Sequence, residues 1–325
     1  MPILFLSWGF VLSHVFILLL YFKQRVRPMF TGLSAFPITP FKNEHIDHNA
    51  FVRIIENLVS ANVESICAMG STGLYPYLTR AQLSELTTLA VEKATDIPVM
   101  VGVGALRTID VLHNVEAVQK AGAKAVLLAP VSYHPLNEDE VFSLYSAVSQ
   151  AVSVPVCVYE NPRVTNFTFS DALYRRITEL PNIGAIKIPG MPFATQQGSE
   201  RLATLRGLLP EHIAIGVSGD AFGAKGMAEG CDLWLSVIGG MFPRTVKHII
   251  ALAQSNESAD ADTVSESLNG VWELFARNGG GLRVMAAAAD ILGFCEGNSL
   301  PSPFLPISSK DHMELDNLIN KLNLV

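Results

Sequence analysis

Short apolar runs alternate with amphipathic stretches along the chain after residue 30. Each run is rich in Val, Ile, Ala or Cys, which is typical of strands in a parallel sheet whose two faces are both covered. The pattern predicts eight such strands. They fall at residues 32–38, 64–69, 98–103, 124–129, 155–160, 183–188, 213–217 and 232–238.

The stretches between these runs carry apolar residues at helical spacing and recognisable helix ends. Thr79 with Gln82, and Asn137 with Glu140, form capping boxes ahead of apolar faces. Gly122 stands where the helix after the third run is expected to stop. Strand–helix units that repeat in this order predict a closed (β/α)8 TIM barrel.

An open, doubly wound sheet is the alternative arrangement of the same units. That architecture carries a glycine-rich phosphate-binding turn between a strand and a helix. Residues 102–107 begin Gly-Val-Gly but continue Ala-Leu-Arg, so the third glycine is missing. The sequence therefore favours the barrel.

The same pattern divides the chain into parts. The barrel is expected to occupy residues 29–245, and residues 246–325 lack strand-like runs and are expected to form a helical extension. Helical patterns there cover residues 264–275, 282–292 and 312–322, and a Gly-Gly-Gly break at 279–281 separates the first two.

Residues 1–28 form a hydrophobic segment unlike the rest of the chain. Residues 3–22 contain no charged side chain, and as a helix they would reach about 30 Å, the thickness of a bilayer core. Lys23, Arg25 and Arg27 follow directly. The segment is therefore a candidate membrane anchor, and the positive charges would place the barrel in the cytoplasm.

Two alternatives to an anchor stay open for this segment. The true start could be Met29, which stands directly before the first expected strand. A cleaved signal peptide fits less well, because a basic n-region and an Ala-x-Ala cleavage site are missing.

Composition narrows the function classes. Charged residues make up only 16% of the chain and the formal net charge is −7, which argues against a nucleic-acid partner. None of the four cysteines forms a CxxC pair, and the eight histidines show no metal-binding spacing. We therefore expect free, buried thiols in a reducing compartment and no structural metal.

Polar side chains follow several of the runs, at the strand ends where a TIM barrel gathers its active site. We expect these residues to line the site: Ser71, Thr72 and Gly73 after the second run, Ser132 and Tyr133 after the fourth, Tyr159 and Arg163 after the fifth, Lys187 in the sixth, and Asp220 after the seventh.

Lys187 is the most informative of these residues. It lies in an apolar run, Ile-Gly-Ala-Ile-Lys-Ile-Pro at 183–189, with no acidic residue nearby in the sequence. An apolar setting favours the neutral amine, which is the nucleophile that Schiff-base chemistry needs. Alternatively, the side chain could reach solvent at the strand end or pair with a carboxylate from another strand.

Tyr159 and residues 70–73 suit the same chemistry. Tyr159 ends the neighbouring run, and its phenol could carry protons as a carbinolamine forms and collapses. Gly-Ser-Thr-Gly at 70–73 offers two hydroxyls and free backbone N–H groups, which could hold a carboxylate. Alone, Tyr159 could equally be a ring that fills the barrel, and residues 70–73 would be more typical of an ordinary loop.

Four motifs in order carry a family resemblance. They are Phe-Pro-Ile-Thr-Pro-Phe at 36–41, Gly-Ser-Thr-Gly-Leu-Tyr-Pro-Tyr-Leu-Thr at 70–79, Tyr-Glu-Asn-Pro at 159–162, and Ile-Lys at 186–187. Together they resemble the dihydrodipicolinate synthase / N-acetylneuraminate lyase superfamily of class I, pyruvate-type aldolases. The resemblance covers about residues 30–300, most of the chain.

The resemblance implies a role for each matching position. Lys187 would form the Schiff base with a 2-keto acid, and Tyr159 would carry protons. Ser71 stands where the family usually has a relay threonine, and Thr72 and Gly73 would hold the keto-acid carboxylate. The resemblance also implies an enzyme without a metal or other cofactor that forms homodimers or homotetramers.

This sequence departs from the family pattern at three places. Leu74 replaces an acid in the loop after the second run, and Ser132, with Tyr133 displaced by one, stands where the synthases have a relay tyrosine that acts across a subunit interface. Val164, beside Arg163, occupies the place of an arginine for a substrate carboxylate. These changes put the lysine-biosynthetic reaction in doubt and leave the Schiff-base residues intact.

Two classes of function follow. The first is a lyase, either aldolase or dehydratase, acting on pyruvate or another 2-keto acid. The second is a non-catalytic barrel that senses a ligand or supports an assembly. Retention of Lys187, Tyr159 and the Ser71–Thr72 pair favours the enzyme.

Overall fold

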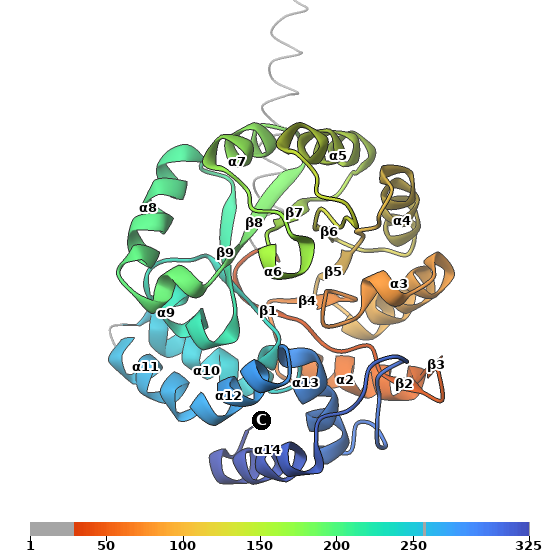
Figure 1. The fold of residues 1–325 in the computed structure, drawn as a ribbon, viewed down its shortest axis with the longest axis vertical. Helices are drawn as coiled ribbons and strands as arrows, with labels where there is room; N and C mark the ends of the chain where they lie inside the picture. Colours follow the sequence, from red (N-terminus) through yellow and green to blue (C-terminus); the bar gives the residue numbers. More distant parts are fainter. Residues whose placement is uncertain (1–28, 256–257, 325) are drawn as a thin grey trace, which may run out of the picture.

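The computed structural model describes residues 29–255 and 258–324, and its centre is a closed barrel of eight parallel strands (Figure 1). The strands pair in the order β1-β10-β9-β8-β7-β6-β5-β4, and β1 closes the ring by pairing with β4. Their bounds are β1 Gly32–Ala35, β4 Ser65–Ala68, β5 Val99–Gly102, β6 Ala125–Leu128, β7 Val156–Tyr159, β8 Ile183–Pro189, β9 Ala214–Ser218 and β10 Leu233–Ser236. Each lies on one of the eight predicted runs, so the predicted barrel is confirmed.

A ring of helices surrounds the strands (Figure 1). The helices between and after the strands are α2 His48–Ser60, α3 Arg80–Ala94, α4 Thr108–Lys120, α5 Glu138–Ala151, α6 Pro162–Thr165, α7 Asp171–Thr178, α8 Gln197–Leu208, α9 Gly223–Ala228 and α10 Pro243–Gln254. Both predicted capping boxes are present, at Thr79 and at Asn137. Gly122 follows α4 with φ +98°, a conformation that costs glycine little.

Four helices follow α10 in the part of the chain that the structure describes. They are α11 Ser258–Ser267, α12 Asn269–Arg277, α13 Gly281–Ile291 and α14 Ser309–Leu322. The single helix expected over 264–275 is wrong, because the chain turns at Leu268, which is buried, before α12 begins. Apolar residues keep helical spacing across this tight turn, so periodicity does not reveal it. The expected end of the barrel at residue 245 falls inside α10.

A two-stranded hairpin, β2 Phe41–Lys42 with β3 His45–Ile46, was also not expected. Its strands have two residues each, which is too short to show alternation. Asn43 and Glu44 form its turn with positive φ angles.

Alternate residues of each strand point to opposite sides of the barrel wall. Outward side chains pack on the helices, and inward side chains form a separate apolar cluster. Met29 and Phe30, just before β1, belong to the inner cluster and are 4% and 1% exposed. They lie at the N-terminal end of the barrel, opposite the strand ends that carry the polar residues, and we call that opposite end the mouth.

All four cysteines are buried and free, as predicted. Burial raises the pKa of the Cys157 thiol to about 12, so the thiol stays protonated beneath the mouth.

The expected membrane anchor at residues 3–22 and the alternatives for residues 1–28 lie outside the described residues. Within the described ranges, no helix is long and apolar enough to cross a membrane.

Candidate active site

Lys187 lies inside the barrel, near the mouth. It shares the inward face of β8 with Ala185 and is only 3% exposed. Its Nζ atom lies 4.0 Å from the ring centroid of Phe36 and 4.1 Å from that of Tyr159. No carboxylate among the described residues forms an ion pair with it. The amine is therefore held between two aromatic faces.

Tyr159 stands beside Lys187 on the neighbouring strand. The two residues are paired in register between β7 and β8, and Tyr159 is 3% exposed. Its hydroxyl oxygen accepts a hydrogen bond from Asn161 Nδ2 at 2.7 Å and lies 3.4 Å from Ser71 Oγ. The structure thus brings together the three residues predicted to be catalytic.

The loop after β4 lies beside Tyr159, because Ser71 Oγ is 3.4 Å from the Tyr159 hydroxyl. None of the N–H groups of residues 71–73 has an acceptor among the described residues. Thr39, after β1, holds the loop in place, because its hydroxyl donates to the Gly73 carbonyl oxygen at 2.7 Å. Thr72 is 4% exposed. The loop can therefore offer several donors to an anion without rearranging.

The turn of this loop is tight and strained. Met69 and Leu74, which flank it, have φ angles of +48° and +61°, a region that non-glycine residues rarely adopt. A Cβ atom on Gly73 would lie 2.6 Å from Met69 Cα, so glycine is required there. Strain of this kind is concentrated at binding and active sites.

Phe36 is a site residue that the sequence did not single out. It follows β1, is 1% exposed, and its ring covers one side of Lys187. Gly70 makes room for the ring, because a Cβ there would lie 2.7 Å from Phe36 Cδ1. The residue begins the motif at 36–41, but an aromatic side chain in an apolar run gives no separate signal of a site.

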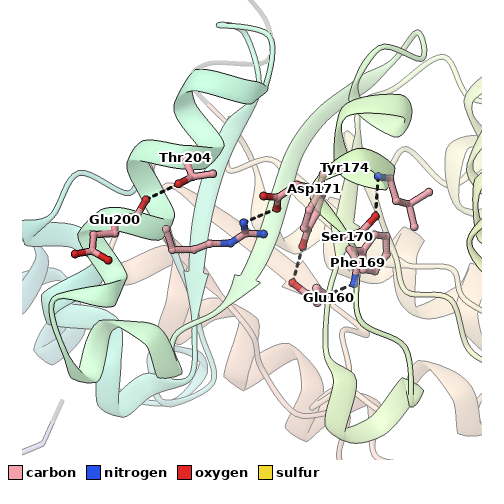
Figure 2. Close-up of polar contacts among 9 residues, drawn as sticks. Glu160, Phe169, Ser170, Asp171, Tyr174, Glu200 and Thr204 are labelled. Atoms are coloured by element: carbon pink, nitrogen blue, oxygen red, sulfur yellow. Dashed lines mark hydrogen bonds and ion pairs between the residues drawn. The ribbon is translucent and has the colours of Figure 1, made fainter.

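Glu160 anchors the segment that follows β7 (Figure 2). Its carboxylate accepts from Phe169 N at 3.1 Å and from the Tyr174 hydroxyl at 2.7 Å, and its own N–H donates to the Lys187 carbonyl oxygen at 3.1 Å. Burial, and then the charge of Glu160, raise the pKa of Tyr174 well above its usual range, so Tyr174 stays a donor. Glu160 therefore fixes the residues after Tyr159 relative to Lys187.

Ser132 and Tyr133 do not join this group within the chain. The Ser132 hydroxyl donates to the His134 carbonyl oxygen in its own loop. Tyr133 is 87% exposed, and its ring contacts the edge of His134 at a centroid distance of 5.1 Å. Both side chains contact their own loop in this chain, and their contact with substrate stays a prediction.

Arg163 lies at the mouth, beside the extension. Its Nη2 atom would be 3.1 Å from a Cβ placed on Gly280, in the loop between α12 and α13. The guanidinium is exposed and has no ion pair among the described residues. It is therefore free to meet a negative group above the barrel.

Asp220 contacts the end of β10 and the residues just after it. Its carboxylate is 5% exposed and accepts four hydrogen bonds, from Trp234 Nε1, Ser236 Oγ, and the N–H groups of Val237 and Ile238 at 2.8–3.2 Å. Burial raises the pKa of Asp220, and these donors and Lys187 oppose that rise. These hydrogen bonds give Asp220 a structural role in fixing the end of β10, and its expected role in binding substrate stays a prediction.

We expect Asp220→Asn to destabilise the fold by about 2 kcal/mol, because an amide cannot accept from all four donors. Urea unfolding should show a lower midpoint with an unchanged slope. Full stability combined with a raised KM would instead favour the role of Asp220 in binding substrate.

Within the described residues, there is no group of three or more His, Cys, Asp or Glu side chains that could hold a metal ion. What does converge is an amine, a phenol and a donor-rich loop.

Comparison with known proteins shows which family has this arrangement of residues. Residues 29–322 match the dihydrodipicolinate synthetase family. The chain belongs to that family. The match to the dihydrodipicolinate synthetase family covers the barrel, nearly all of the helical extension and the four sequence motifs.

Individual relatives are similar over half of the chain or more. A 4-hydroxy-tetrahydrodipicolinate synthase of Rickettsia typhi is 25% identical over 91% of this chain and 98% of its own length. A second, from Phenylobacterium zucineum, is 29% identical over 50% of this chain and 55% of its length. The crystal structure of dihydrodipicolinate synthase from Agrobacterium tumefaciens has 37% identity and a TM-score of 0.87, covering 93% of this chain and 99% of that one.

Family membership makes this chain a class I lyase of the dihydrodipicolinate synthase type. The comparisons give no support to the alternative of a non-catalytic barrel.

Proposed function

We propose that Lys187 forms an imine with pyruvate or a closely related 2-keto acid. The observation that supports this most directly is the placement of Lys187 Nζ, which lies between two rings, beside the Tyr159 phenol and without a carboxylate partner among the described residues. A lysine amine that has no ion-pair partner is available to attack the carbonyl carbon of a bound keto acid.

The keto-acid carboxylate would bind the loop at 71–73. The backbone N–H groups there lack acceptors in the described part of the chain, and the loop is already held by Thr39. Binding the carboxylate at this loop would orient C2 towards Lys187. Donors fixed in advance lose little energy to reorganisation, which is the usual basis of such anion sites.

Imine formation would then proceed in two proton-coupled steps. The lone pair of Lys187 Nζ attacks C2, and the carbonyl oxygen takes the proton of the Tyr159 hydroxyl. The resulting phenolate takes one proton from nitrogen, which leaves a neutral carbinolamine and restores the Tyr159 hydroxyl. Water leaves with a second proton delivered through Tyr159, and the C2=N bond forms. Ser71, 3.4 Å from the Tyr159 hydroxyl, would pass protons between that hydroxyl and the mouth.

The imine then serves as the electron sink for the second half of the reaction. The protonated imine accepts the electron pair released when a proton or a carbon fragment leaves C3, which is the step that breaks a C–C bond in the cleavage direction. The resulting enamine can take up a proton, form a new C–C bond, or expel a hydroxyl group from C4 as water. The covalent imine supplies this chemistry itself, so the proposal requires no metal or other cofactor.

Arg163 would select the second substrate or the distal end of a longer one. Its guanidinium is exposed at the mouth without an ion pair in the described ranges. Val164 stands where the family resemblance implied an arginine, so Arg163 would approach a distal carboxylate from a neighbouring position. The second substrate is therefore expected to carry a negative group.

Assembly into a homodimer or homotetramer stays part of this proposal. Large apolar side chains next to the mouth, among them Leu106 and Tyr133 at 69% and 87% exposure, support a contact between copies.

Borohydride trapping tests the proposed function. The full chain is incubated with pyruvate, 2-oxobutyrate, 2-oxoglutarate or acetone, then reduced and digested, and the labelled peptide is identified by mass. We expect one adduct per chain, on Lys187, with pyruvate labelling fastest and acetone, which lacks a carboxylate, labelling poorly. Absence of any 2-keto acid adduct would refute the proposal.

A further inference from the structure

Asn161 makes a specific contact with Tyr159 that the proposed mechanism does not use. Its Nδ2 atom donates to the Tyr159 hydroxyl oxygen at 2.7 Å, which is shorter than the 3.4 Å between that oxygen and Ser71 Oγ. This is the only hydrogen bond of the Asn161 side chain within the described residues. The side chain is therefore directed at the phenol.

The main chain of Asn161 is held independently of its side chain. Its carbonyl oxygen accepts from Val164 N at 3.1 Å, Thr165 N at 3.0 Å and Thr165 Oγ1 at 3.0 Å. It precedes α6, but its side chain makes no capping hydrogen bond to that helix. Replacing the amide group should therefore leave the backbone of this segment in place.

The direction of the hydrogen bond determines what Tyr159 can do. A phenolic hydroxyl has one proton to donate, and its oxygen can accept from a neighbour. Because Asn161 donates to the oxygen, the Tyr159 proton must point away from Asn161, towards Ser71 or towards an oxygen of the substrate. An amide N–H does not exchange roles with the phenol, so it keeps donating while the oxygen loses and regains its proton.

We propose that Asn161 is a positioning residue that orients the Tyr159 hydroxyl and stabilises its oxygen as the proton leaves. This inference rests on the proposed role of Tyr159 as proton carrier. The position expected to supply a relay hydroxyl across an interface is Ser132, whose hydroxyl is directed into its own loop. Asn161 gives Tyr159 a second polar partner within the same chain.

Glu160 holds Asn161 in a fixed position relative to the Lys187 amine. Glu160, between Tyr159 and Asn161, donates its N–H to the Lys187 carbonyl oxygen at 3.1 Å, and its carboxylate is held by Phe169 and Tyr174. A backbone hydrogen bond thus links the segment that carries Tyr159 and Asn161 to the strand that carries Lys187. Groups that must act in sequence benefit from such fixed placement.

Asn161→Leu tests the inference, because leucine has a similar size and no donor. We expect kcat to fall about 10–100-fold, the range for losing a hydrogen bond to an oxygen that becomes charged. KM for the 2-keto acid should stay within about twofold, since the carboxylate loop is untouched. Asn161→Asp, which keeps the shape and loses the donor, should show the same loss.

A double-mutant cycle with Tyr159→Phe separates positioning from general damage. If Asn161 acts through the phenol, Asn161→Leu should have little further effect on kcat when Tyr159 is already Phe. Thr165→Val is the matched control, because it loosens the same segment without touching Tyr159, and its kcat should stay near that of the wild type.

Three outcomes would overturn this inference: additive losses in the cycle, a loss confined to KM, or an equal loss in Thr165→Val. If Tyr159→Phe is slow and Asn161→Leu is normal, the inference fails while the proposed function stands. If the wild type forms no adduct at Lys187, the proposed function fails, and this inference fails with it.

Discussion

Lys187→Ala should abolish both imine trapping and turnover. The side chain supplies the amine that lies between the Phe36 and Tyr159 rings, and a methyl group cannot form a C=N bond with the substrate. The loss should therefore exceed that of any other single change. It is measured by peptide mass after borohydride reduction and by the rate of keto-acid consumption at saturating substrate.

Lys187→Arg is the informative control for this prediction. It keeps a long, positive side chain that can still fill the space, but a guanidinium stays protonated and does not form the imine. We expect it to fail as completely as alanine. A label that lands on Lys124 or Lys225 in the wild type would show that the site has been placed wrongly.

Tyr159→Phe should slow turnover by roughly 10²–10⁴-fold, the usual contribution of a positioned proton carrier. The ring that flanks Lys187 is kept, so the amine should hold its place and some adduct should still form on long incubation. The expected signature is a large fall in kcat with trapping that is slower but not lost. Steady-state kinetics and the time course of trapping measure the two effects separately.

Tyr77→Phe is a matched control for that variant. Tyr77 is 54% exposed, and its ring packs on Phe304, so removing its hydroxyl should change kcat little. If Tyr159→Phe also retained wild-type kcat, another group would have to carry the protons.

The barrel could be predicted from the sequence because its strands are covered on both faces. Each strand then leaves a continuous apolar run of the right length, which is a strong signal even without alternation. Where burial does not change along the chain, as at the turn between α11 and α12 at Leu268, the pattern has no break and the boundary was missed.

The site was predictable where a residue type conflicts with its setting. Lys187 is a charged type in an apolar strand, and this conflict identified it. Phe36 and Asn161 fit their settings, an aromatic ring after an apolar strand and an asparagine before a proline, so only the three-dimensional contacts reveal their importance. Asp220 stood at the correct strand end, but its hydrogen bonds come from β10 and the residues just after it, which sequence position cannot show.

The packing of Met29 and Phe30 into the N-terminal end of the barrel leaves the active site with access from one end. These two side chains belong to the apolar cluster that fills the barrel, so we expect substrate, product and the water expelled on imine formation to pass through the end where the polar residues lie. Molecules would then pass through this end one after another, and the expelled water would leave before a second reactant binds beside the imine. A product that leaves slowly through this end would therefore be expected to delay both hydrolysis of the imine and entry of the next substrate.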